Sequence, residues 1–306
     1  MKKQNKGALF AVLAAVLYAV SSPFSKLLLE KLAPTMLASL LYLGAGAGLF
    51  VVGLFIKKRK ECPLTRKELP YTAAMVLLDI AAPIFLMLGL RTAAAANVSL
   101  LNNFEIAATS IIALCAFGER ISARLWLGIG LVTAASVILS IEDKGSFSFS
   151  AGSLFVLLAC VCWGFENNCT RKLSSKDPLE TVVIKGFGSG LGSLAIAACI
   201  GELSFDAVYV PCALLLGFVA YGLSIYFYIY AQRTLGAAKT SAYYAIAPFI
   251  GALLSVVIFA SPPKAMFWVA FAVMMTGTYF VTKDNREEQN NGQEKGFQIR
   301  QKSREL

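Results

Sequence analysis

Ionisable side chains inside long apolar runs are the residues of this sequence whose types could do chemistry. Asp79 and Glu105 each lie near the middle of such a run, and Glu166 and Lys185 lie nearer the ends of two later runs. Inserting a charged side chain at the centre of a membrane helix costs at least about 2.5 to 3.5 kcal/mol, so each should face protein or water rather than lipid. These four residues are therefore candidates for binding a solute or a proton.

Glu105 has polar neighbours that could hold its side chain. Asn102 and Asn103 lie within one helical turn of it. At roughly 100° per residue, Glu105 shares a face of a helix with Asn102 while Asn103 points elsewhere, which predicts Asn102 as the partner. Intramembrane acids form proton relays in pumps and transporters, so Glu105 could exchange a proton for a cationic substrate. The alternative, for Glu105 and Asp79 alike, is a buried acid that only links helices through neighbouring Asn or Ser side chains.

Two later apolar runs carry further candidates. Trp163, Glu166 and Asn167 lie in one run and Lys185 lies in the next. Glu166 and Lys185 both fall near the predicted cytoplasmic ends of their helices, where they could form an ion pair or act as a gate. The ring faces of Trp163 and of Tyr18 could bind an organic cation with about 0.5 to 2 kcal/mol, or they could simply pack.

Tyrosines are numerous in the apolar runs of the last third of the chain. Buried phenols need hydrogen-bond partners, which favours a wet cavity, whereas tyrosines near the ends of a span can be interfacial anchors. Tyr243 and Tyr244, a turn inside a predicted span, are candidates for the substrate site. The whole group comprises Tyr221, Tyr226, Tyr228, Tyr230, Tyr243 and Tyr244.

The elements that must position these residues are membrane spans. Hydrophobic residues make up 57% of the 306 residues, charged residues only 15%, and the mean hydropathy is +0.66, whereas soluble domains are roughly a quarter charged. About 20 apolar residues cross the hydrocarbon core as a helix. The runs predict an all-α membrane protein with about ten spans: Gly7–Leu29, Pro34–Ile56, Pro70–Leu90, Thr92–Phe117, Leu125–Ile141, Gly152–Cys169, Leu179–Ile200, Val208–Ala231, Ala237–Ala260 and Met266–Thr282.

The net charge of +10 reflects topology rather than nucleic-acid binding. Lys and Arg residues lie between the apolar runs, not along one amphipathic face with interleaved aromatic residues. Most of the 28 fall in alternate loops or in the C-terminal tail, and cytoplasmic loops are the ones that carry such an excess. This predicts a multi-pass protein of the cell membrane with both termini in the cytoplasm.

An internal repeat organises the spans. Residues 7–27 align with residues 152–172 without a gap, which argues against a signal peptide because the first span recurs in mid-chain. The repeat continues in both halves, pairing Gly44, Gly46 and Gly48 with Gly188, Gly190 and Gly192, Arg91 with Arg233, and Ser99 with Ser241. Five spans in each half is an odd number, so the second half should be inverted in the membrane.

The repeat predicts the domain organisation and an asymmetry. The expected segments are a cytoplasmic N-terminus (1–6), two five-helix repeats (7–141 and 152–282) and a polar, disordered cytoplasmic tail (283–306). The repeat aligns Asp79 with Tyr221 and Glu105 with Ala247, so the acids belong to one half only. Such asymmetry favours a substrate or proton site over a structural need shared by both halves.

Glycines and prolines suggest where helices approach or bend. The paired glycines of the second and seventh spans predict close packing, with hinge motion as the alternative. Pro83 and Pro248 should kink their helices at membrane depth.

The order of several short motifs makes the chain resemble the drug/metabolite transporter superfamily, in the ten-helix type with two EamA domains. The motifs are the duplication itself, Arg91-Thr92 with Ala95-Ala96, Asn103-Phe104-Glu105, Gly118-Glu119-Arg120, and Ala247-Pro248-Phe249. Ala260-Ser261-Pro262 replaces the Gly-Glu-Arg turn in the second half. The resemblance implies a central cavity lined by spans one, three, four, six, eight and nine, with spans five and ten at the periphery.

The sequence excludes several other functions. It has no histidine, no HExxH, no GxSxG and no P-loop, so neither an intramembrane enzyme nor an ATPase is expected. The cysteines lack metal spacing, and neither a metal nor a cofactor is predicted. We expect a secondary-active transporter that exports a small cationic or zwitterionic metabolite or drug, with protons as a further ligand. The alternatives are a flippase for a lipid-linked substrate and a structural or receptor-like membrane protein.

Overall fold

The computed structural model describes residues 2–55, 62–117, 122–143, 147–173, 176–235, 240 and 243–280. The predicted C-terminal tail and the Gly118-Glu119-Arg120 turn lie outside the described residues. The α-helices are α1 (Lys2–Ala19), α2 (Ser21–Leu28), α3 (Pro34–Phe55), α4 (Leu69–Thr92), α5 (Ala95–Leu101), α6 (Phe104–Phe117), α7 (Ala123–Ser140), α8 (Ala151–Leu173), α9 (Pro178–Cys199), α10 (Tyr209–Gly217), α11 (Ser224–Leu235) and α13 (Ala247–Phe259). A last helix covers Ala265–Phe280.

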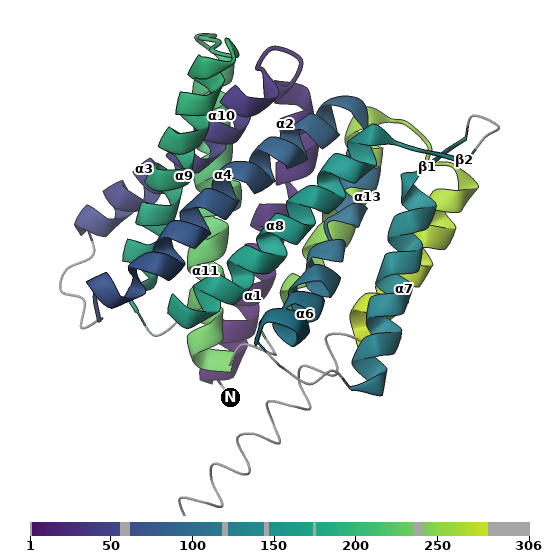
Figure 1. Ribbon diagram of the computed structural model, residues 1–306, viewed down its shortest axis with the longest axis horizontal. Helices are drawn as coiled ribbons and strands as arrows, with labels where there is room; N and C mark the ends of the chain where they lie inside the picture. Colours follow the sequence, from purple (N-terminus) through teal and green to yellow (C-terminus); the bar gives the residue numbers. More distant parts are fainter. Residues whose placement is uncertain are drawn as a thin grey trace, which may run out of the picture.

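Three smaller elements complete the described part. A 3₁₀ turn, η1 (Arg66–Glu68), precedes α4, and a π-helical segment, η2 (Phe218–Leu223), joins α10 to α11. The strands β1 (Ile141–Asp143) and β2 (Phe147–Phe149) pair antiparallel and form a short ribbon between the two halves of the chain. The two strands lie between helices α7 and α8, so the body of the protein is helical (Figure 1).

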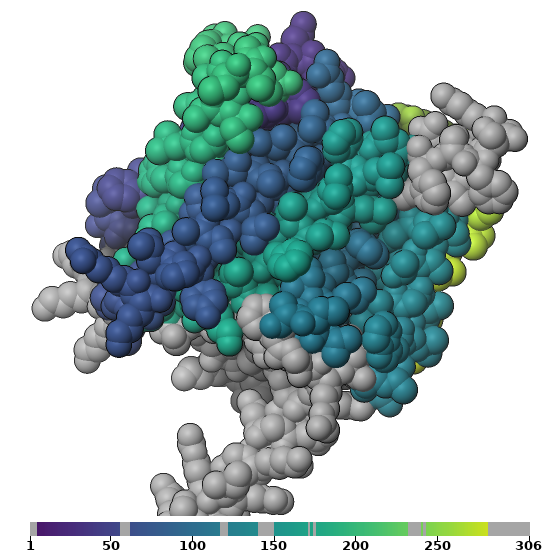
Figure 2. Space-filling view, viewed as in Figure 1, coloured from purple at the N-terminus to yellow at the C-terminus, as the bar shows by residue number. Residues whose placement is uncertain are grey.

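The helices confirm the prediction of an all-α membrane protein. Seven helical segments of the described chain are long and apolar enough to cross a membrane, and three shorter apolar helices accompany them: Ala123–Leu139, Ala247–Phe259 and Ala265–Phe280. Together these account for about ten spans. Figure 2 shows α4 and α8 side by side on one face. Leu77 on α4 and Leu158 and Phe165 on α8 are exposed. Large apolar side chains on an outer face are expected where that face meets lipid.

Local sequence fixes several helix starts. Pro34 and Pro178 begin α3 and α9, where the missing amide proton is not needed and the fixed φ suits a helix. The Asp177 carboxylate accepts the backbone N–H of Leu179 at 2.9 Å and caps α9. Asp206 does the same before α10, and the backbone N–H groups of Tyr209 and Val208 lower the pKa of its carboxyl group.

The two halves pack around each other through equivalent pairs of helices. The second span, α3, lies along the seventh, α9, while α4 lies along α8 and α1 lies along α11 (Figure 1). At the α3–α9 crossing the repeat is visible in detail: a Cβ on Gly46 would lie 2.9 Å from the backbone nitrogen of Phe187, and one on Gly190 would lie 2.8 Å from that of Leu43. The small residues let the two backbones approach closely, as helices in membranes require.

Several spans are interrupted near the middle of the protein. The first span breaks between α1 and α2, and the fourth breaks at Asn102–Asn103, between α5 and α6. The ninth has a turn at Ala245–Ile246, at nearly the position that the repeat aligns with the break in the fourth. Pro83 lies inside α4, but Pro248 lies in the first turn of α13, so its predicted kink is instead the start of a new helix. Broken spans of this kind often surround the binding site of a transporter.

Candidate functional site

Three charged side chains from three helices meet in the interior of the protein. The ammonium group of Lys185 on α9 lies 2.9 Å from Oδ2 of Asp79 on α4 and 3.1 Å from Oε1 of Glu166 on α8. The side chains of Asp79 and Glu166 are 0% and 3% exposed. The predicted Glu166–Lys185 pair is thus present, but Asp79, predicted to face a substrate, shares the same lysine.

Two hydroxyl groups hold the carboxylates of this triad. Tyr42 on α3 donates a hydrogen bond to Oδ1 of Asp79 at 3.0 Å, and Thr170 on α8 donates one to Oε1 of Glu166. Asp79 therefore keeps Oδ2 for the lysine. The hydroxyl groups leave the acids paired and hydrogen-bonded, which is the condition for charges to persist in a low dielectric.

Glu105, near the start of α6, has a different environment. Asn167 on α8 donates to its Oε1 at 2.7 Å and also contacts the Thr109 hydroxyl at 3.3 Å. Among the described residues, no Lys or Arg side chain lies within ion-pair distance of Glu105. The Glu105 residue as a whole is partly exposed, unlike Asp79 and Glu166.

The predicted Asn102 partner of Glu105 requires a correction. The prediction assumed a continuous helix, but the fourth span breaks at Asn102–Asn103, so the 100° periodicity is lost between Asn102 and Glu105. Asn102 is buried, and its Oδ1 has no hydrogen-bond partner in the structure. The polar group that Glu105 needs comes instead from Asn167, on another helix and in the other half of the chain.

The break in the fourth span is itself polar. Asn103 is fully buried, and neither its amide oxygen nor its amide nitrogen has a partner in the structure. The thiol of Cys160 on α8 lies 3.7 Å from the carbonyl oxygen of Leu101 and 3.9 Å from that of Asn102. A thiol is a weak donor, so it only partly replaces the helical hydrogen bonds lost at the break.

A row of tyrosine rings joins the triad to the neighbourhood of Glu105. The Tyr42 ring lies 5.4 Å from that of Tyr221, Tyr221 lies 5.9 Å from Tyr18, and Tyr18 lies 5.7 Å from Tyr244. Tyr228 follows at 4.9 Å from Tyr244. Tyr18, Tyr221 and Tyr244 are all close enough to Glu105 to interact with its charge.

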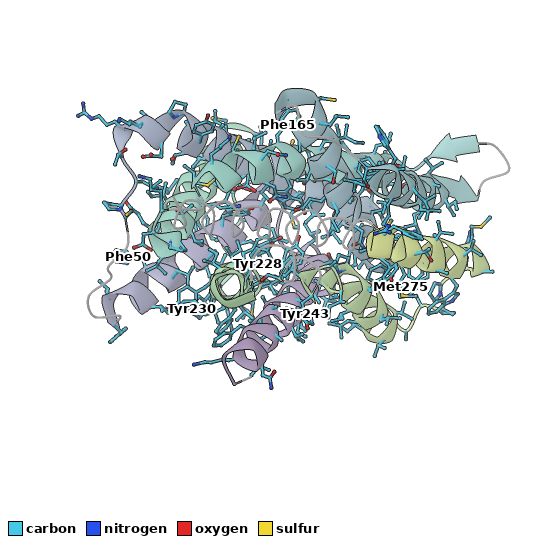
Figure 3. All side chains as sticks on the ribbon, turned by 90° about the horizontal axis from the view of Figure 1, so that it is seen from below. Phe50, Phe165, Tyr228, Tyr230, Tyr243 and Met275 are labelled. Atoms are coloured by element: carbon cyan, nitrogen blue, oxygen red, sulfur yellow. The ribbon has the colours of Figure 1, made fainter. Side chains whose placement is uncertain are left out.

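The other predicted tyrosines take varied positions. In Figure 3, Tyr228 and Tyr243 lie among the helices near the centre of the view, whereas Phe165 lies at the outside. Tyr243 is partly exposed on the helical stretch before α13. Tyr226 and Tyr230, four residues apart on α11, have ring centres 4.8 Å apart.

Among the described residues, the ring of Trp163 makes no ring contact with that of Tyr18, its repeat equivalent, which instead lies beside Tyr221 and Tyr244. The Trp163 ring is buried and lies close to Tyr42, the residue that holds Asp79. Tyr42 was not among the residues predicted from the sequence, although a lone phenol inside the apolar second span was a signal that could have identified it.

Ties at the two ends of the bundle connect helices outside this centre. At one end the ammonium group of Lys26 on α2 donates to the carbonyl oxygens of Leu90, Arg91 and Ala93, where α4 ends. At the other end Lys176 lies 3.2 Å from Glu68. Lysines favour the C-terminal ends of helices because the last carbonyl groups lack helical partners.

The fold and the central polar cluster define a multi-pass membrane protein with two helical repeats around ionisable residues. The model of the EamA-like transporter family matches residues 5–141 and again residues 150–283. The chain therefore belongs to the EamA-like transporter family, a family of small-molecule transporters and not of enzymes.

The remaining comparisons concern the fold and the curated proteins. One solved crystal structure is similar to this chain with a TM-score of 0.65 and 18% sequence identity, covering 92% of this chain and 97% of its own. At that identity the similarity shows the fold. No curated protein matches the sequence.

Proposed function

We propose that this transporter exports a small organic cation or zwitterion in exchange for protons. Glu105 is the residue that binds them in turn. The substrate's positive group binds the Glu105 carboxylate while the proton leaves, and on the return a proton takes the place of the substrate. One charge replaces another, so the carboxylate is never left unpaired in the interior.

The environment of Glu105 carries this proposal. It is a partly exposed acid inside a membrane span, and its hydrogen bond from Asn167 is neutral, so its charge remains available to a ligand. Intramembrane acids are costly and commonly mark substrate or proton pathways. Asp79 is assigned differently from the sequence prediction, because Lys185 already neutralises it.

The tyrosines near Glu105 favour an organic cation. The rings of Tyr18 and Tyr244 lie 5.7 Å apart, and both are partly exposed. A cation over a tyrosine face gains about 0.5 to 2 kcal/mol. An acid and aromatic faces together suit an ammonium group that carries apolar substituents.

Alternating access is the proposed mechanism of movement. The two five-helix units, residues 7–141 and 152–282, would rock against each other about the central cluster, as inverted repeats do in other carriers. We place both termini in the cytoplasm, in keeping with the distribution of Lys and Arg. The test is a cysteine introduced at position 3 and a cysteine-reactive label that cannot cross the membrane. Labelling that occurs only after the cells are permeabilised would support that placement.

The test of the proposed function is exchange by purified protein in proteoliposomes. A thermal-shift screen of amines, quaternary amines, amino acids and nucleobases first supplies a ligand. We expect Glu105→Gln to lower proton-driven transport of that ligand at least tenfold and to remove its pH dependence. Glu30→Gln changes an exposed acid at the end of α2 by the same chemistry and should leave both unchanged. Unaltered pH-dependent transport by Glu105→Gln would refute the proposal.

A further inference from the structure

The Lys185 ammonium group occupies a site that other groups hold in shape. Its nitrogen lies 2.9 Å from an oxygen of Asp79 and 3.1 Å from an oxygen of Glu166, and both acids are buried. Tyr42 fixes the Asp79 carboxylate and Thr170 fixes that of Glu166. Each carboxylate therefore has a hydrogen bond besides its contact with the lysine.

The charges around this site are unequal. Asp79, Glu166 and Glu105 are three acids, and Glu105 interacts electrostatically with both Glu166 and Lys185. Lys185 is the one Lys or Arg that the described residues place within ion-pair distance of any of them. Without Lys185, the two adjacent carboxylates would need another cation or would take up protons, because buried charges need partners.

We propose that Lys185 is a built-in occupant of an ammonium-binding site formed by Asp79 and Glu166, and that it thereby determines the charge of the transported substrate. With the lysine in place, Glu105 is the one acid left for a ligand, and a substrate with a single ammonium group is matched. With the lysine shortened, the Asp79–Glu166 site accepts a primary ammonium group from solution. This specificity assignment rests on the proposed function, but the site itself does not.

The chemistry of the site selects primary ammonium groups. A lysine nitrogen presents three N–H donors on a flexible stem, and two of them can point at the two carboxylates. A quaternary ammonium ion of similar charge has no N–H donor. An alcohol has a donor but no charge. The two kinds of control therefore separate the hydrogen bonds from the charge.

Chemical rescue of Lys185→Ala tests the site without any transport assay. Alanine keeps Cβ, so the atoms removed correspond to n-propylammonium. We expect the thermal unfolding midpoint of detergent-purified Lys185→Ala to fall below that of the unmodified protein, and n-propylammonium to restore at least half of the loss. Propan-1-ol and tetramethylammonium at the same concentration should restore less than a fifth.

Two control variants distinguish the site from a general salt effect. Lys176→Ala removes a lysine that pairs with Glu68 at 3.2 Å near the surface, and n-propylammonium should not raise its midpoint. The triple variant Asp79→Asn, Glu166→Gln, Lys185→Ala lacks the charges of the site. It should fold without n-propylammonium, and n-propylammonium should not change its unfolding midpoint. If Lys185→Ala is recovered only when purified with n-propylammonium, the proposal is supported equally.

Opposite results would overturn the inference. The site is refuted if Lys185→Ala is as stable as the unmodified protein, or if n-propylammonium stabilises the triple variant as much as Lys185→Ala. The specificity claim is tested in proteoliposomes by competition between propylammonium and 1,3-diammoniopropane. Lys185→Ala should shift the preference at least tenfold toward the diammonium ion, and an unchanged ratio would refute this claim. A chain that transports no cation at all would refute the proposed function but would leave the rescue result standing.

Discussion

Substitution of Gly44 by alanine should strongly destabilise the protein, because the second and eighth spans touch there through their backbones. A Cβ on Gly44 would lie 2.1 Å from the carbonyl oxygen of Leu214 on α10, and one on Gly217 would lie 2.1 Å from that of Leu41 on α3. Ordinary van der Waals contact begins at 3.4 Å. The helices would thus have to separate by about 1.3 Å, since a backbone carbonyl cannot rotate away as a side chain can.

The magnitude follows from this separation. Overpacking a well-packed interior costs typically about 1 to 3 kcal/mol, and a backbone clash on both sides of a crossing lies at the upper end. We expect Gly44→Ala and Gly217→Ala each to lower the free energy of unfolding by about 3 kcal/mol. One separation of the helices relieves both clashes, so the double variant should lose clearly less than the sum.

The assay is reversible unfolding in mixed micelles by a denaturing detergent, followed by far-UV circular dichroism. Gly130→Ala on α7 is the matched control, because a Cβ there would meet nothing within 4 Å. It should be neutral or slightly stabilising, as alanine favours a helix over glycine. If Gly44→Ala were as stable as Gly130→Ala, or if the double variant lost the full sum, the packing argument would fail and the hinge interpretation of these glycines would gain.

Three further predictions concern the site and the ties around it. Asn167→Leu removes the donor to Glu105 and should lower proton-driven transport several-fold in proteoliposomes, whereas Asn167→Gln should retain more than half; equal losses would contradict a role through the hydrogen bond. Tyr244→Ala should weaken binding of an organic cation by about 2- to 30-fold in a thermal-shift titration, the range that one cation–π contact supplies. Tyr244→Phe should keep most of the affinity. An equal loss of affinity in Tyr244→Phe would assign the effect to the hydroxyl group. Lys26→Met removes three charge-assisted hydrogen bonds at the end of α4 and should cost about 2 kcal/mol of unfolding free energy. Lys176→Met should cost under about 1 kcal/mol, because the ion pair of Lys176 is near the surface. Similar costs for the two variants would show that burial does not set the size of the effect.

The fold could be predicted from the sequence because its determinants are local. A run such as Pro34–Phe55 is apolar over 22 residues, and hydrophobicity alone places it in the membrane as a helix. The duplication could be read because Gly44, Gly46 and Gly48 recur in order in the second half. Gly44 and Gly46 pack against the backbones of other helices, a role that their spacing favoured, whereas Gly48 meets the side chain of Phe218.

The site was predictable as a set of residues but not as a set of contacts. Glu105, Asp79, Glu166 and Lys185 were identifiable because charges are rare in apolar runs. Their pairing depends on how α4, α8 and α9 cross, which no local pattern encodes. The Asn102 prediction failed for a local reason, since nothing in the periodicity around it indicates that the helix stops at Asn102.

The contacts give the asymmetry between the halves a physical meaning. Asp79 and Glu105 belong to the first half, and their charged or amide partners, Lys185 and Asn167, belong to the second. A rocking motion of one half against the other must therefore change the distances within these pairs. Because an uncompensated buried carboxylate is costly, each such change favours a ligand or a proton at the acid that loses its partner. In the proposed mechanism, ligand binding is coupled to movement because Asp79 and Glu105 lie on one half while Lys185 and Asn167 lie on the other.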